Sequence, residues 1–90
     1  MRVVWRPNAI ANLAEIVAYI AADNPSAARA MQARIEDAAT DIAQQPLIYR
    51  IGRVPGTREL VVHPNYIVIY RVLPDWSEVV GVMHARRKYP

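Results

Sequence analysis

The 90-residue sequence predicts an α+β fold of order β-α-α-β-β-β, in which an antiparallel helix hairpin packs on a mainly antiparallel sheet. Three observations predict this fold. Apolar residues recur every three or four positions through residues 8–44, which is the period of a helix. After Gln45-Pro46 the period falls to two, which is the period of a strand. Between the two helical stretches, Asp23-Asn24-Pro25-Ser26 marks a break, because Asn caps helices and Pro suits their first turn.

The chain opens with a short strand and a helix. Residues 1–5 are rich in β-branched and aromatic side chains, as strands are, and Pro7-Asn8 then favours a helix start. Over residues 8–22 we expect a helix with one apolar face, which Ile16 and Tyr19 widen, so that the helix packs on two sides. This face is formed by Ile10, Leu13, Val17 and Ile20.

A second helix is expected from Pro25 to Gln44. The connection between the two helices is short, which makes them antiparallel neighbours. Small side chains in the second helix let the two approach closely. Its apolar stripe consists of Ala28, Met31, Ile35, Ala38 and Ile42.

The second half of the chain predicts a three-stranded antiparallel meander. A loop at residues 47–57 comes first. Tight turns at residues 63–65 and 74–77 then separate strands over residues 58–62, 66–73 and 78–85.

Composition excludes several classes of site. The length suits one domain over residues 1–90, and no apolar stretch is long enough to span a bilayer, so the expected location is the cytoplasm. With no cysteine, two histidines and scattered acids, no metal site is expected. No nucleotide-binding glycine motif is present, and no cofactor is expected.

Charge is divided unequally along the chain. Residues 1–45 hold four arginines against five acids, a net charge of −1, whereas residues 46–90 hold seven cations against three acids, a net charge of +4. A basic half favours a nucleic acid, a nucleoprotein target or an acidic protein partner. The same arginines would also serve simply to solubilise an apolar sheet.

One of these arginines interrupts an apolar row. Alternation along residues 66–73 places Arg71 on the same strand face as Ile67 and Ile69. A charge in such a row must reach solvent, a ligand or a carboxylate, and Glu59 and Glu78 on the neighbouring strands are the candidates for an ion pair.

Four segments together resemble the RelE/ParE superfamily of toxins from bacterial type II toxin–antitoxin systems. They are the helix junction at residues 19–25 (YIAADNP), residues 55–60 (PGTREL), residues 66–72 (YIVIYRV) and residues 82–87 (VMHARR). The resemblance covers essentially the whole chain, and it implies the same β-α-α-β-β-β fold.

The superfamily implies two alternative activities. RelE-like members are ribosome-dependent mRNA endoribonucleases, and ParE-like members inhibit DNA gyrase without a known catalytic constellation. Nucleases commonly carry an Arg in the central strand where this sequence has Ile67, which removes a group that would stabilise phosphate charge. We therefore favour the ParE-like reading, with no catalytic residues and with Arg58, Arg71, His84, Arg86 and Arg87 as candidate contacts. The nuclease alternative would use Arg58, Arg86, Lys88 and Tyr89.

Both readings imply the same partner. It is a ParD-like antitoxin whose acidic, amphipathic C-terminal segment folds on the toxin and gives a hetero-oligomer. The groove expected to receive this segment lies on the helix hairpin and is lined by Leu13, Val17, Ile20, Met31 and Ile35.

Overall fold

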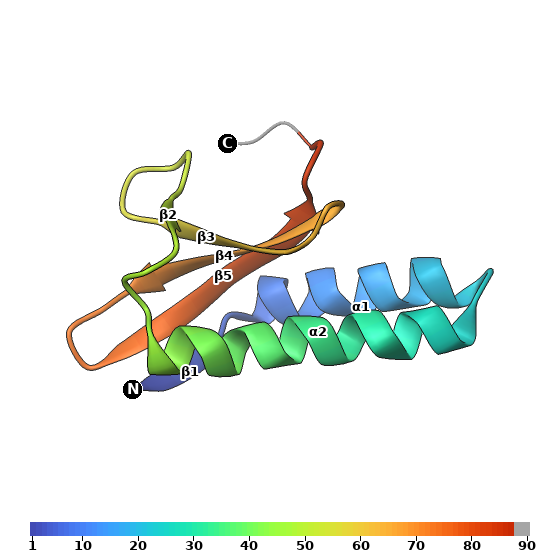
Figure 1. The fold of residues 1–90 in the computed structure, drawn as a ribbon, viewed down its shortest axis with the longest axis horizontal. Helices are drawn as coiled ribbons and strands as arrows, with labels where there is room; N and C mark the ends of the chain where they lie inside the picture. Colours follow the sequence, from blue (N-terminus) through green and yellow to red (C-terminus); the bar gives the residue numbers. More distant parts are fainter. Residues whose placement is uncertain (88–90) are drawn as a thin grey trace.

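Two layers make up the fold, with a pair of helices on one side of a five-stranded sheet (Figure 1). The computed structural model describes residues 1–87. Within this range the elements are β1 (Arg2–Trp5), α1 (Pro7–Ala21), α2 (Pro25–Gln44), β2 (Arg50–Ile51), β3 (Arg58–His63), β4 (Tyr66–Val72) and β5 (Trp76–His84). The predicted fold class, order and helix hairpin are confirmed.

The sheet has the strand order β1-β5-β4-β3-β2. Strands β3, β4 and β5 form the predicted antiparallel meander, and β2 adds to it in the antiparallel sense. Strand β1 pairs with β5 in parallel, from Arg2 opposite Trp76 to Trp5 opposite Val79. The helix hairpin is therefore the connection that carries the chain from one edge of the sheet to the other.

The second helix matches its sequence pattern closely. The Asn24 side chain caps its first turn by accepting a hydrogen bond from the Ala27 backbone N–H at 3.0 Å, and Pro25 occupies the first helical position. Every residue of the predicted stripe is buried, and all but Ala28 belong to the main core cluster.

The first helix packs on the core with only part of the apolar face that was predicted. Its fully buried residue is Ala9, and the side chains packed against the core are Leu13, Ile16 and Ile20. Ile10 is 55% exposed. The two helices lie side by side on one sheet, so α1 has one face toward the sheet and one toward α2. The apolar band of α1 is wider than these two contacts can cover.

The sheet differs from prediction at two points. Residues 50–51, expected to be loop, form the short edge strand β2, whose residues Arg50 and Ile51 lie opposite Glu59 and Arg58. Strand β5 begins at Trp76 rather than at residue 78, because the Leu73 N–H donates to the Trp76 carbonyl at 2.8 Å and closes a tighter turn. The added residues, Trp76 and Ser77, pair with Arg2 and Val3 of β1.

Side chains of β4 define the two faces of the sheet. Tyr66, Val68 and Tyr70 belong to the core under the helices. Ile67, Ile69 and Arg71 therefore point to the opposite face, called the outer face below. Ile67 and Ile69 are also buried, at 0% and 4% exposure. Neither helix of the described chain is long and apolar enough to cross a membrane.

Candidate functional site

The two strand arginines that the sequence grouped as contacts lie on opposite faces of the sheet. Arg58 shares the helix-side face with Leu60 and Tyr70. Its guanidinium Nη1 donates to the carbonyl oxygens of Tyr49 at 2.8 Å and Leu47 at 3.2 Å. Arg58 therefore holds the segment that leaves α2, and it does not share a surface with Arg71.

Arg71 lies on the outer face and is exposed. Its cross-strand neighbour is Glu78, yet within residues 1–87 Arg71 forms no ion pair. Glu78 lies instead 3.8 Å from Arg6, from Oε1 to Nη1. Of the alternatives open for Arg71, an ion pair with Glu59 or Glu78 is not formed, and its guanidinium points into solvent.

A buried carboxylate organises the loop between β2 and β3. Glu59 is only 3% exposed, and its Oε1 accepts from Arg50 Nε at 3.0 Å and Nη2 at 2.7 Å. Its Oε2 accepts from the Arg53 backbone N–H at 3.2 Å and lies 3.6 Å from Arg53 Nε. Sequence reasoning missed this cluster. The available signal was an acid inside an apolar strand, a few residues after two arginines.

A buried tyrosine, Tyr70, holds the segment that follows α2. The Tyr70 hydroxyl donates to the Pro46 carbonyl, just after α2, and its ring meets Tyr49 edge-on with centroids 6.5 Å apart. Burial raises the pKa of the Tyr70 hydroxyl; the Arg58 charge lowers it in part, and Tyr49 adds to the increase. Arg58 and Tyr70 thus fix residues 46–49 from the helix side.

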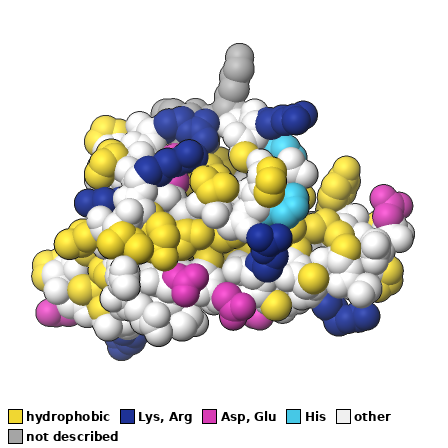
Figure 2. All heavy atoms as spheres, in the orientation of Figure 1, with side chains coloured by type: hydrophobic (Ala, Val, Ile, Leu, Met, Phe, Trp, Pro, Cys, Tyr) yellow, Lys and Arg dark blue, Asp and Glu magenta, His cyan; other side chains and the backbone are white. Residues whose placement is uncertain are grey.

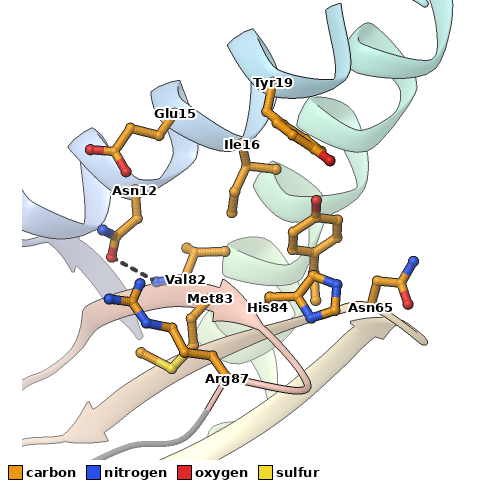
Figure 3. Close-up of a pocket in the computed structure, with 10 residues that line it drawn as sticks. Asn12, Glu15, Ile16, Tyr19, Asn65, Val82, Met83, His84 and Arg87 are labelled. Atoms are coloured by element: carbon orange, nitrogen blue, oxygen red, sulfur yellow. Dashed lines mark hydrogen bonds between the residues drawn. The ribbon is translucent and has the colours of Figure 1, made fainter. Parts of the chain in front are cut away.

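A polar pocket of about 400 Å³ lies between α1 and the ends of β4 and β5 (Figure 3). The His84 ring meets Tyr66 edge-on at 5.4 Å, and Tyr19, Asn65 and Arg87 line the rim. His84 Nδ1 accepts from the Arg86 backbone N–H at 3.1 Å, so the neutral ring carries its proton on Nε2.

Two asparagines of α1 shield the edge of β5 beside this pocket. Strand β1 ends opposite Val79, so the later part of β5 lacks a strand on that side. Asn8 Nδ2 donates to the Val80 carbonyl at 2.7 Å, and Asn12 Oδ1 accepts from the Val82 N–H at 3.2 Å (Figure 3 shows the latter). The two side-chain amides occupy the place of a missing strand.

The remaining candidate contacts fall in different places. His84 and Arg87 line the pocket, and Arg86 is exposed just after β5. Lys88 and Tyr89, which the nuclease alternative requires, lie outside the described residues. Ile67 is fully buried at the position where the resemblance places a nuclease arginine. Among residues 1–87, no group of three or more His, Cys, Asp and Glu side chains is placed to hold a metal ion.

The predicted helix groove is only partly present. Leu13 and Val17 line a shallow groove of about 500 Å³ between the helices, together with Ile10, Gln32 and Glu36. Met31 and Ile35 face the sheet and are 8% and 0% exposed, and Ile20 packs against the core. The prediction that Met31 and Ile35 line this groove is corrected, because their stripe is the one that α2 buries against the sheet.

Comparison with known proteins gives consistent matches along the chain. Residues 3–89 match the family model described as the ParE toxin of the type II toxin–antitoxin system parDE. The chain is 42% identical to the proposed toxin Y4kP of Sinorhizobium fredii, over 99% of this chain and 93% of that protein. It is 37% identical to the toxin RelE2 of Caulobacter vibrioides, over 96% of this chain and 97% of that protein.

Solved structures share the fold at low sequence identity. A chain from a chromosomal ParDE toxin–antitoxin system of P. aeruginosa superposes with a TM-score of 0.82 at 19% identity, covering 93% of this chain and 95% of that one. A YoeB/ParE toxin from Agrobacterium tumefaciens gives a TM-score of 0.68 at 15% identity, covering 93% of this chain and 98% of that one. The arrangement of two helices on a five-stranded sheet is therefore shared with these toxins.

Proposed function

Because the chain belongs to the ParE toxin family of type II toxin–antitoxin systems, we propose that it inhibits DNA gyrase and that a cognate ParD-like antitoxin neutralises it. On this proposal the chain acts as an inhibitory binding protein and performs no chemistry of its own.

The observation that carries the proposal is the apolar centre of the outer face. Cleavage of a phosphodiester needs cationic or hydrogen-bonding groups aimed at the charge that develops on the phosphate. Ile67 and Ile69 fill this centre instead, and both are buried. Arg58, which the nuclease reading needs, bonds to two loop carbonyls on the other face of the sheet.

The exposed cations supply contacts for a large target. Arg71 and Arg86 are exposed without an ion pair among residues 1–87, and His84 and Arg87 lie together at the pocket. These groups are suited to recognising a polar or acidic surface. We assign them to the contact with gyrase or with the antitoxin.

The same arrangement suits the proposed antitoxin. The groove beside Leu13 and Val17 offers an apolar floor to one face of an amphipathic helix. The arginines of the sheet layer offer counter-charges to its acidic residues. Such a segment would order on binding, and its acidic side chains would cover cations that gyrase otherwise meets.

One comparison favours the alternative activity, mRNA cleavage on the ribosome. The relative at 37% identity bears the name RelE2. Under this alternative, Arg86, Lys88 and Tyr89 would carry the reaction.

The two functions are separated by the lesion that they cause. Purified chain, gyrase, ATP and supercoiled plasmid are incubated, and the products are denatured and digested with protease. Gyrase poisoning yields linear plasmid only when gyrase and the chain are both present. In cells, it gives an SOS response, and Tyr89→Phe leaves toxicity intact. The opposite result would contradict the proposal and support the nuclease alternative. In that case no plasmid is cleaved, mRNA is cut at defined codon positions, and Tyr89→Phe abolishes these cuts.

A further inference from the structure

Charge in the fold is sorted by layer, more sharply than the two halves of the sequence suggest. Residues 7–44, the helix layer, hold five acids and two arginines, a net charge of −3. The rest of the described chain, residues 1–6 and 45–87, holds eight arginines and three acids, a net charge of +5. Figure 2 shows most cations on the sheet side and most acids over the helices. The sheet layer is thus the basic end of a dipolar molecule.

On the outer face of this layer, arginines surround the apolar centre of Ile67 and Ile69. Alternation places Arg2 and Arg71 on this face, since Val3, Trp5 and Tyr70 face the core. Arg50 and Arg53 also lie at this face, because both contact the side chain of Glu59, which points to it. After β5 the chain leaves the sheet on the side away from the helices (Figure 1). The exposed Arg86 belongs to this segment, whereas the Arg87 side chain lines the pocket beside α1.

The acids of the outer face leave some of these arginines without an ion pair among residues 1–87. Glu59 is buried and takes contacts from Arg50 and Arg53. Glu78 lies beside Arg6. Arg71 and Arg86 have no carboxylate within ion-pair distance in residues 1–87.

We propose that the outer face of the sheet binds the phosphate backbone of duplex DNA directly. This rests on the proposed gyrase function, because a gyrase complex presents duplex DNA beside the protein. The chain would then contact both components of that complex. It would hold the DNA with the sheet layer, while the acidic helix layer is repelled from it.

The type of cation supports phosphate as the ligand. Ten of the eleven cations of the chain are arginines, whose planar fork of donors matches phosphate oxygens in pairs. Five strands about 4.8 Å apart give a face roughly 19 Å across, which is wide enough to reach phosphates on both sides of a DNA groove.

The aromatic content favours a duplex over single-stranded RNA. Proteins that read single strands stack the bases on exposed aromatic rings. In the described part of the outer face, Trp76 is the aromatic side chain available on the strands, and Arg2 already lies over its ring at 5.7 Å from the centroid. Within residues 1–87 this face offers charge, but it offers no open ring on which a base could stack.

The test is the binding of a short fluorescent DNA duplex to the full-length chain, without gyrase, over a series of salt concentrations. Two double variants are compared, R71Q/R86Q on the sheet layer and R29Q/R34Q on the helix layer. Each lowers the formal net charge from +3 to +1, and all four side chains are exposed. Loss of two phosphate contacts should reduce the slope of log K against log salt by about 1.8 in R71Q/R86Q and weaken binding about tenfold or more. R29Q/R34Q should bind within about twofold of the unaltered chain, because no phosphate contact is lost.

Three results would overturn the inference. They are the absence of duplex binding at low salt, equal losses in the two double variants, and tighter binding of single-stranded RNA than of the duplex. The gyrase assay separates this inference from the function itself. Gyrase-dependent plasmid cleavage without duplex binding refutes the DNA contact alone, whereas duplex binding without plasmid cleavage refutes the gyrase function and with it the setting for this contact.

Discussion

At the scale of single residues, Glu59 is the acid that accepts the most side-chain hydrogen bonds among the residues that the structure describes. Its carboxylate is almost completely buried and connects β3 to Arg50 and to the Arg53 backbone. It therefore holds the β2–β3 loop over the outer face. The charge of Arg50, whose side chain is 56% exposed, stays largely hydrated.

Replacing Glu59 with Gln should lower the free energy of unfolding by about 2 kcal/mol, because charge-assisted hydrogen bonds to a buried acceptor are lost. Urea denaturation measures this. The matched control is Glu78→Gln, which removes a more exposed and longer ion pair and should cost less than about 1 kcal/mol. Equal costs would mean that Glu59 does not anchor the loop.

Tyr70 makes the free energy of unfolding depend on pH in the alkaline range. Its pKa is raised in the folded chain, mainly by burial, so the folded state keeps this proton at a pH where the unfolded chain releases it. The unfolding free energy that this tyrosine contributes is therefore constant below about pH 10 and falls as pH rises from there. Tyr70→Phe should cost about 1 kcal/mol at pH 7, because the Pro46 carbonyl loses its donor.

Urea titrations at pH 7 and above pH 10 test this expectation. The difference in stability between the parent chain and Tyr70→Phe should shrink at the higher pH. Tyr19→Phe is the control, since that ring is 77% exposed. A constant difference across the range would show that the Tyr70 hydroxyl does not couple folding to pH.

At the scale of elements, the sequence predicted best where the pattern is local. The buried stripe of α2 and the cap at Asn24 could both be predicted, because each depends on residues within a few positions of one another. Strand β2 could not be predicted, because two residues are too few to show an alternating pattern. They form a strand only by pairing with β3. Likewise, the bonds of Arg58 to the carbonyls of Leu47 and Tyr49 depend on the path of the loop, which no strand alternation predicts.

The edge of β5 allows a sharp comparison of two asparagines on one helix. Asn8 donates to a carbonyl, whereas Asn12 accepts from an N–H. Asn12→Asp should therefore leave the unfolding free energy nearly unchanged, and Asn8→Asp should lower it by about 1 kcal/mol, since a carboxylate cannot donate to the Val80 carbonyl. The favourable position of an acid in the first turn of α1 reduces the second cost only in part.

Thermal or urea denaturation of the two variants at pH 7 makes the comparison at equal charge. Each substitution adds one negative charge to the same face of the same helix. The assignment of donor and acceptor would be refuted if Asn12→Asp proved the more damaging change. Asn8→Gln, which keeps the donor, should restore part of the loss in Asn8→Asp.

At the scale of the whole molecule, the two layers present two different surfaces. The helices offer an apolar groove, and the sheet offers arginines. The sequence predicted a basic second half and an apolar helix face, but not the sorting of charge by layer. Nor did it show that Met31 and Ile35, which belong to the predicted stripe of α2, are too deeply buried to line the groove. Both depend on which side of each element faces the other layer.

Val17→Lys should weaken capture of the co-expressed product of the adjacent upstream reading frame by tenfold or more, because a desolvated charge in an apolar contact costs about 2 kcal/mol. Val17 lines the groove but is not among the residues that pack against the core, so the chain should stay folded. Ala30→Lys, at an exposed position of α2, should bind normally. Pull-down with circular dichroism as a folding check measures both, and undiminished capture by Val17→Lys would place the antitoxin elsewhere.

The parallel pairing of β1 with β5 also sets the order of events during synthesis. The first strand of the chain has no neighbour in the sheet until the last strand has been made, and α1 likewise rests on β5. Contacts between such distant segments close a long loop and slow folding. A nascent chain on the ribosome therefore cannot complete the sheet until β5 has emerged. The basic outer face therefore takes its final form only after β5 has been made.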